Sequence, residues 1–193
     1  MRPRSSGSKR ASPAPAVFLV GFMGAGKSSV GRALGKALNC GFEDLDDRIE
    51  RSEGRPIAEI FRAAGENEFR RVERVALQQL LREMADGDAR VIGLGGGAFV
   101  QEDNAAVLKA AGVFTVFLDA PVDELWRRCV EQADGQGLRR PLLRSMVRFR
   151  TLHENRQAAY RKASMRIQTG GRTVGEIVEE IAKMVRLKWQ QSK

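Results

Sequence analysis

Short apolar runs alternate along the chain with longer segments in which apolar residues recur every three or four positions. Short runs bounded by glycine, proline or aspartate are typical of buried strands, whereas the longer period is typical of helices with one buried face. Five strands are predicted, over 17–20, 42–46, 90–94, 113–119 and 165–169. Seven helices are predicted, over 27–39, 56–64, 66–84, 104–111, 121–132, 145–161 and 174–188. This alternation predicts an α/β domain with a parallel sheet covered by helices on both faces.

Residues 1–16 differ from the rest, because they are rich in proline, serine and arginine and contain almost nothing that a core could bury. We expect a disordered basic tail there, followed by a single domain over 17–193 that is large enough to fold without disulfides. The tail has no apolar stretch long enough for a secretory signal, and no segment approaches the length of a membrane span. An organelle transit peptide is the alternative, but we expect a cytoplasmic protein.

One glycine-rich segment points most directly to a chemistry. Gly21-Phe22-Met23-Gly24-Ala25-Gly26-Lys27-Ser28 follows an apolar strand and opens a predicted helix, which is the setting of a phosphate-binding P-loop. Its glycines let backbone N–H groups approach phosphate oxygens at a helix N-terminus. Lys27 can then reach the β- and γ-phosphates, and the Ser28 hydroxyl can ligate Mg²⁺. A plain glycine turn is the alternative interpretation. The flanking strand and helix favour a nucleotide-triphosphate enzyme.

Two aspartates end the second predicted strand, in Asp44-Leu45-Asp46. Because strand side chains alternate, we expect both carboxylates on the same side, at the sheet edge where ligands of open α/β folds bind. One carboxylate could hold hydrated Mg²⁺, and the other could orient or deprotonate an acceptor hydroxyl. The alternative is an acidic helix N-terminus, with Asp46 and Asp47 as cap and first-turn residues. These residues alone favour neither interpretation.

A glycine turn and three arginines extend the candidate site. Gly95-Gly96-Gly97 follows the third strand and permits close approach of a ligand, although a tight turn is the alternative. Arg70, Arg140 and Arg156 stand where a ligand could use them, since a guanidinium binds carboxylate or phosphate as a fork. For Arg70, an ion-paired helix face is the alternative. The stretch from Ala133 to Arg140 is glycine-rich and basic, which predicts a mobile loop.

The formal net charge is +9, and four of these positive charges lie in the acid-free tail. The remaining +5 suits an enzyme that binds a polyanionic nucleotide and an acidic substrate. No basic run alternates with aromatic residues, so we expect no nucleic-acid partner. Cys40 and Cys129 lack the spacing of metal ligands or redox pairs, so we expect free, buried thiols in a reducing cytosol. His153, the only histidine, is expected to be structural or solvated.

Taken together, these residues resemble the shikimate kinases, and the resemblance extends from Val17 to the final helix. The matching segments are the P-loop, the Asp-x-Asp pair, Ile57 to Phe61, Glu68 to Glu73, the triple glycine, Arg140 to Leu143, and Arg156 with Tyr160. Ser29 stands where the family often has threonine, and Ala158 where it usually has proline. The stretch from Arg128 to Arg140 is longer than usual for the family.

The resemblance implies a P-loop NTPase fold of the nucleoside-monophosphate-kinase-like type, with a five-stranded parallel sheet, a substrate-binding helical part and a lid over about 133–145. It implies transfer of the γ-phosphoryl group of ATP to the 3-hydroxyl of shikimate, a step toward chorismate and the aromatic amino acids. It places ATP at Gly24, Ala25, Gly26, Lys27, Ser28, Ser29 and Arg140, Mg²⁺ at Ser28 and Asp44, and shikimate at Asp46, Arg70, Gly95, Gly96, Gly97 and Arg156. Lys27, Asp46 and Arg140 are the implied catalytic residues.

Two alternatives stay open at this point. Among kinases, the alternative is a gluconate or nucleotide kinase, although the arginine pair favours a carboxylate acceptor over a base. From another class, the chain could be an ATP-binding module or a regulatory pseudo-kinase, which the joint presence of Lys27, Ser28, Asp44 and Asp46 disfavours. The expected partners are ATP and shikimate, with no nucleic acid and no membrane, and we expect a monomer.

Overall fold

The computed structural model describes residues 16–85, 89–136 and 145–191. Within them, five strands form one sheet in the order β2-β3-β1-β4-β5, and each neighbouring pair is parallel. The strands are β1 (Ala16–Val20), β2 (Gly41–Asp44), β3 (Arg90–Gly93), β4 (Phe114–Asp119) and β5 (Met165–Gln168). The helices are α1 (Lys27–Ala37), α2 (Leu45–Glu53), α3 (Ile57–Ala85), α4 (Glu102–Ala110), α5 (Val122–Gln136), α6 (Met146–Tyr160) and α7 (Val174–Gln191), with a short 3-10 helix η1 (Ala98–Val100). The predicted parallel α/β sheet is confirmed.

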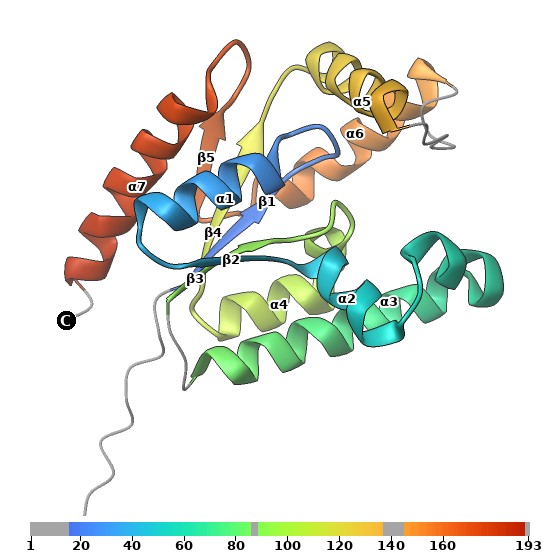
Figure 1. Ribbon diagram of the computed structural model, residues 1–193, viewed down its shortest axis with the longest axis horizontal. Coiled ribbons are helices and arrows are strands. Elements are labelled where there is room, and N and C mark those ends of the chain that lie inside the picture. The colour runs from blue at the N-terminus through green and yellow to red at the C-terminus, as the bar shows by residue number, and fades with distance from the viewer. Residues whose placement is uncertain (1–15, 86–88, 137–144, 192–193) are drawn as a thin grey trace, which may run out of the picture.

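Helices cover both faces of the sheet, because parallel strands are joined by crossover connections. Helices α1 and α7 pack against each other on one face, and α3 and α4 lie together on the other (Figure 1). Helices α5 and α6 pack against one another near the carboxyl ends of the strands (Figure 1). All five residues of the central strand β1 are buried. Burial on both faces explains the unbroken apolar sequence that made this strand easy to predict.

The second strand ends two residues earlier than predicted. Strand β2 stops at Asp44, and the unpredicted helix α2 begins at Leu45. Only Leu45 and Ile49 of its nine residues are buried, so α2 leaves little apolar periodicity in the sequence. The two helices predicted on either side of Gly65 form the single element α3, which is broken at Gly65 with φ 77° and ψ −178°. This break lies where the predicted helices were separated.

The predicted loop over 133–140 is partly wrong, because α5 continues through Gln136. The residues from Ala133 to Gln136 therefore form the last turn of a helix. Residues 137–144, which include Arg140 and most of the predicted lid, lie outside the described residues, as do 1–15 of the predicted tail. Among the helices of the described ranges, none has the length and apolar character needed to cross a bilayer.

Candidate active site

The glycine-rich segment joins the carboxyl end of β1 to the first residue of α1 (Figure 1). Gly24 and Gly26 have φ values of 77° and 86°, in the left-handed region that glycine adopts without a steric penalty. Gly26 is the N-cap of α1, and the first turn of this helix contains no acidic residue. The N–H groups at this helix start and the helix dipole therefore favour an anion. The predicted strand-loop-helix setting of the P-loop is confirmed.

Lys27 is folded back onto the loop. Its Nζ donates to the carbonyl oxygens of Gly21 at 2.9 Å and Phe22 at 3.0 Å. Burial lowers the pKa of Lys27, while the carboxylates of Asp46 and Asp44 act in the opposite direction. The ammonium is thus held by neutral carbonyls and by two nearby carboxylates, and a phosphate group would offer it a stronger, charged acceptor.

Asp44 connects the P-loop helix to helix α2. Its Oδ2 accepts from the Ser28 hydroxyl at 2.9 Å, and its Oδ1 accepts from the backbone N–H of Asp46 at 3.0 Å. The second bond makes Asp44 the N-cap of α2. The strand-alternation argument for the two aspartates is therefore wrong, since Asp46 lies in the first helical turn. Both interpretations of this pair hold in part, because the capped helix start brings Asp44 and Asp46 to one cavity.

The carboxyl group of Asp46 has an unusual environment. Burial, reinforced by the negative charge of Asp44, raises the pKa of Asp46 to about 6, against a weaker opposing effect of Lys27. A carboxylate with a pKa near the working pH can accept a proton and remain ionised for most of the time. Asp46 therefore has the properties of a group that orients or deprotonates a hydroxyl.

Each glycine of the triple-glycine turn lies against at least one polar side chain. A Cβ atom on Gly95 would collide with the carboxylate of Asp46, and one on Gly97 would stand 2.5 Å from Nη1 of Arg70. The carbonyl oxygen of Gly96 accepts from Arg156 Nη1 at 3.1 Å and from the Tyr160 hydroxyl. The turn thus provides room for an acid and an arginine that come from two different helices, and it anchors a second arginine.

Arg70 reaches this turn from helix α3 while it is ion-paired along the helix. Its Nη1 donates to Glu73 at 2.9 Å, and its Nη2 donates to Glu66 at 3.1 Å. Glu73 is only 1% exposed, and burial raises its pKa although Arg70 acts in the opposite direction. The alternative interpretation of Arg70, an ion-paired helix face, is therefore correct as far as these contacts go. It coexists with the contact at Gly97, so the pairing does not remove Arg70 from the site.

One cavity of about 340 Å³ joins the P-loop, the two aspartates, Gly96, Gly97 and Arg156, whereas Arg70 reaches the turn at Gly97 without forming part of the cavity lining. It is lined by Met23, Gly24, Gly26, Lys27, Ser28, Ser29, Asp44, Asp46, Leu94, Gly96, Gly97, Gln132 and Arg156. Ala25 and Gly95 are buried and do not belong to this lining. Sequence reasoning missed Gln132 and Leu94 as lining residues, and it missed the anchoring roles of Tyr160 and Glu73. The spacing of Tyr160, four residues after Arg156, was the available signal.

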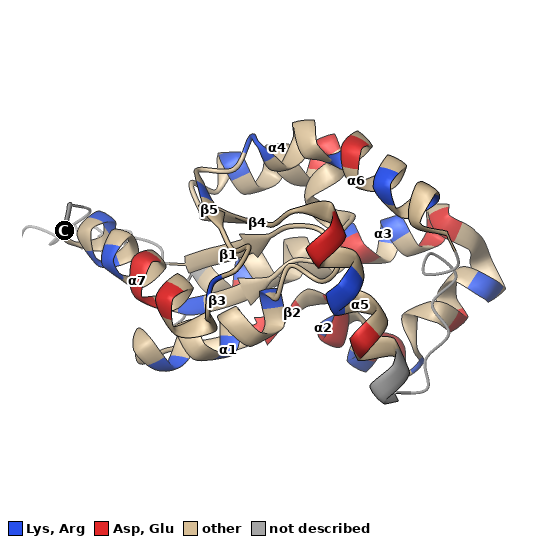
Figure 2. Ribbon diagram, turned by 90° about the horizontal axis from the view of Figure 1, so that it is seen from above, with Lys and Arg blue, Asp and Glu red and all other residues tan. Residues whose placement is uncertain are grey.

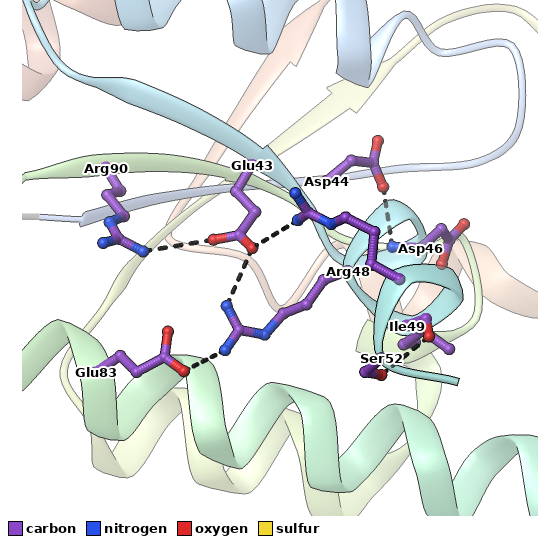
Figure 3. A network of polar contacts seen from close by, with 9 residues as sticks. Glu43, Asp44, Asp46, Arg48, Ile49, Ser52, Glu83 and Arg90 are labelled. Carbon is purple, nitrogen blue, oxygen red and sulfur yellow. Dashed lines mark hydrogen bonds and ion pairs between the residues drawn. The ribbon is translucent and has the colours of Figure 1, made fainter. Parts of the chain in front are cut away.

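A charged cluster fixes helix α2, which carries Asp46. The Glu43 carboxylate accepts from Arg48 at 3.0 Å and from Arg90 at 3.5 Å (Figure 3). It also accepts from Arg51 at 3.1 Å. Arg48 also pairs with Glu83 of α3, so it links β2, α2 and α3 (Figure 3). The side chains of Glu43 and Arg48 are each 17% exposed. Such partly buried, multiply bonded pairs limit the motion of a short helix that has few buried apolar residues.

Arg128 of α5 borders the P-loop from the other side. It donates to the Glu124 carboxylate at 2.5 Å, to the carbonyl oxygen of Thr169 at 3.3 Å and to that of Gly24 at 3.5 Å. Charged positions are frequent along the ribbons of α2, α3, α5 and α6 (Figure 2). Arg128 therefore links the P-loop at Gly24 to Thr169, which follows β5.

The predicted metal ligands, Ser28 and Asp44, are suited to a divalent cation that prefers oxygen. Ser28 and Asp44 place a hydroxyl and a carboxylate in direct contact at the start of α1. Mg²⁺ takes few protein ligands and completes its shell with waters and substrate phosphates. Among the described residues, no cluster of three or more His, Cys, Asp or Glu side chains could hold a metal alone. This donor set is suited to a metal that arrives with a nucleotide.

The P-loop follows the central strand of a parallel sheet, and a serine-aspartate pair, a second acid and two arginines lie around it. This combination is typical of P-loop kinases that act on small molecules. The family model described as shikimate kinase matches residues 23–186. The chain belongs to the shikimate kinase family, and it is an enzyme of the phosphotransferase class.

Individual relatives agree with this assignment. A shikimate kinase of Thermus thermophilus is 42% identical over 179 residues, which cover 89% of this chain and 91% of that protein. One of Geobacter metallireducens is 42% identical over 168 residues, covering 86% and 88%. The structure of the Acinetobacter baumannii shikimate kinase in complex with shikimate is 34% identical, with a TM-score of 0.78, and covers 91% of this chain and 94% of that one.

A gluconokinase of Sinorhizobium meliloti shares the fold at a TM-score of 0.57, but at only 18% identity. It covers 95% of this chain and all of that chain. The likeness therefore shows a common architecture and nothing about the acceptor. The family match separates the chain from the gluconate and nucleotide kinases that the sequence motifs left open.

Proposed function

We propose that the described residues carry out the activity of the shikimate kinase family in the following way. The P-loop residues from Gly24 to Ser29 bind the phosphates of ATP, and the acceptor lies across the cavity between Asp46 and Arg156. The phosphoryl group passes to the 3-hydroxyl of shikimate. The observation that carries this proposal is the single cavity whose wall contains Lys27, Ser28 and Asp44 together with Asp46 and Arg156.

The phosphate side needs charge neutralisation more than covalent chemistry. Lys27 exchanges the carbonyls of Gly21 and Phe22 for phosphate oxygens, and its positive charge offsets the charge that develops on the transferred group. Ser28 and Asp44 would hold Mg²⁺, which supplies further positive charge at the phosphates when bound. We include Arg140 as a third cation on the basis of the sequence, although it lies outside the described residues.

The acceptor side combines one acid with two arginines. Asp46 aligns the acceptor hydroxyl and receives its proton, which its raised pKa permits. Arg70 and Arg156 hold the shikimate carboxylate, since both approach adjacent glycines of one turn. Gly95, Gly96 and Gly97 leave the space that these side chains and the acceptor share.

We also infer a monomer that works in the cytoplasm. Neither Cys40 nor Cys129 forms a disulfide, which suits a reducing compartment. Sedimentation with and without ligands would test the first inference, and fractionation of cells would test the second.

A coupled assay of ADP release tests the proposed reaction. We expect ADP to form rapidly with ATP, Mg²⁺ and shikimate, slowly without shikimate, and slowly with gluconate or a nucleoside monophosphate in its place. Identification of shikimate 3-phosphate in the product would establish which hydroxyl receives the group. ADP release that is independent of shikimate, or faster with another acceptor, would contradict the proposal.

A further inference from the structure

Phe22 lies between the nucleotide loop and helix α6, which carries Arg156. The Phe22 side chain is 1% exposed. Its ring meets that of Phe149 edge-on, with centroids 5.0 Å apart, and that of His153 edge-on at 5.3 Å. The guanidinium carbon of Arg156 lies 5.7 Å from the centre of the same ring. Three residues of α6 therefore enclose one side chain of the P-loop.

The contacts lie along one face of α6. Phe149, His153, Arg156 and Tyr160 are spaced by four, three and four residues, which places their side chains on neighbouring turns of that face. Towards the glycine turn, Arg156 and Tyr160 both donate to the carbonyl oxygen of Gly96. Arg156 is thus held from one side by a hydrogen bond and from another by an aromatic ring.

These two contacts restrain the orientation of the guanidinium. The hydrogen bond with Gly96 uses Nη1 and limits the position of one end of the group. A cation near an aromatic ring is attracted to the ring electrons, most strongly where water is excluded. Burial lowers the pKa of the neighbouring His153, which favours the neutral form of this ring beside the guanidinium. A bidentate fork needs a defined plane, because both of its N–H groups must point at one carboxylate.

We propose that Phe22 is a positioning residue for Arg156, whose guanidinium its ring holds in the orientation that receives the acceptor carboxylate. The inference rests on the proposed role of Arg156 in binding shikimate. The carbonyl oxygen of the same residue accepts from Lys27 at 3.0 Å. Phe22 is therefore in contact with the phosphate-binding cation through its backbone and with the acceptor-binding cation through its side chain.

Phe22→Leu tests the proposal, because leucine remains apolar but offers no ring to the guanidinium. We expect the dissociation constant for shikimate, measured by isothermal titration calorimetry, to rise about tenfold, with the KM for shikimate rising in parallel. The KM for ATP and kcat should change by no more than about twofold. Phe18→Leu is the matched control, since Phe18 is fully buried in β1 and lies outside the cavity lining. It should lower stability and leave shikimate affinity unchanged.

A double-mutant cycle with Arg156→Lys tests whether Phe22 affects shikimate affinity through Arg156. If Phe22 acts through Arg156, Phe22→Leu should add little to the loss of shikimate affinity that Arg156→Lys causes alone. Additive losses, or a shikimate dissociation constant for Phe22→Leu within about twofold of the unaltered protein, would overturn the proposal. Phe22→Met provides a second apolar replacement if the leucine variant is poorly folded. Failure of the unaltered protein to bind shikimate would instead refute the proposed function, and this inference with it.

Discussion

The guanidinium of Arg70 lies directly against Gly97, although 26 intervening residues, strand β3 among them, separate the two in the chain. A Cβ atom at position 97 would stand 2.5 Å from Nη1 and 2.7 Å from Nη2 of that arginine. Such distances are well inside van der Waals contact, so the side chain would have to move. The absence of a side chain at Gly97 therefore determines where Arg70 can lie.

Gly97→Ala should consequently weaken acceptor binding while the protein stays folded. We expect the KM for shikimate to rise about tenfold through displacement of Arg70, and the KM for ATP to stay nearly constant. Gly41→Ala is a suitable control, because no atom lies within 4 Å of a Cβ atom there. Steady-state kinetics on both variants measure the difference. Equal shikimate KM values in the two variants would show that Arg70 does not depend on this contact.

Replacement of either acceptor arginine by lysine tests the proposed carboxylate clamp. Arg70→Lys and Arg156→Lys keep the charge but lose the fork, so we expect shikimate to bind about tenfold to a hundredfold more weakly and ATP to bind almost normally. Calorimetric titration of each variant with each ligand separates the two effects. Arg74→Lys is the control on α3, since Arg74 pairs with Asp103 at 2.6 Å. If ATP affinity fell and shikimate binding were retained, these arginines would have to be assigned to the nucleotide site.

Lys27→Met should leave a folded protein that transfers almost no phosphoryl group. Lys27 makes polar contacts with two loop carbonyls and contributes little to the core, whereas its charge is proposed to act in the transition state. Loss of one such group lowers kcat by roughly 10²-fold to 10³-fold. Turnover is measured beside circular dichroism and thermal unfolding. Near-normal turnover in a folded variant would remove Lys27 from the mechanism.

The two aspartates should respond differently to conversion to asparagine. Asp46→Asn is expected to depress kcat severely, since it removes the group that is proposed to align the acceptor hydroxyl. Asp44→Asn should mainly raise the Mg²⁺ concentration needed for activity, because Asp44 contacts Ser28 at the predicted metal pair. Magnesium titrations on both variants make the comparison. Indistinguishable Mg²⁺ profiles would contradict the separate assignments.

The raised pKa of Asp46 also predicts a change in stability with pH. Burial, and then the charge of Asp44, raise this pKa from its ordinary value of 3.8 to about 6 in the folded protein. The folded state thus binds the proton more tightly than the unfolded state, so ionised Asp46 costs stability as the pH rises from about 4 to about 6.

Asp46→Asn removes that cost. It should raise the free energy of unfolding by on the order of 1 kcal/mol at about pH 7.5 and leave it almost unchanged at about pH 4. Urea unfolding at both pH values gives the comparison. Asp123→Asn serves as the control, because Asp123 lies at the exposed start of α5. An equal stability change at both pH values would contradict the raised pKa.

Local signals in the sequence were sufficient for most of the fold. The apolar run of β1 followed by glycines and Lys27 predicted a strand, a turn and a helix start, and the structure places all three as expected. Helix α2 was missed because only Leu45 and Ile49 face the core. The end of α5 was misplaced because the segment from Ala133 to Gln136 has the composition of a loop but adds one more helical turn. Helix α2 depends on its cap by Asp44 and on the ion pairs of Arg48, which leave little periodicity in the sequence.

The candidate site shows the same division between local and distant information. Residue type and order by themselves determined a P-loop, a pair of acids, a glycine turn and a set of arginines, because each of these is a local chemical pattern. Only the tertiary structure decided that Asp44 caps α2, that Gly95 accommodates Asp46, and that α3 and α6 bring Arg70 and Arg156 to one turn. These relations join segments far apart in the chain, and they arise from the packing of helices on the sheet, which no short stretch of sequence encodes.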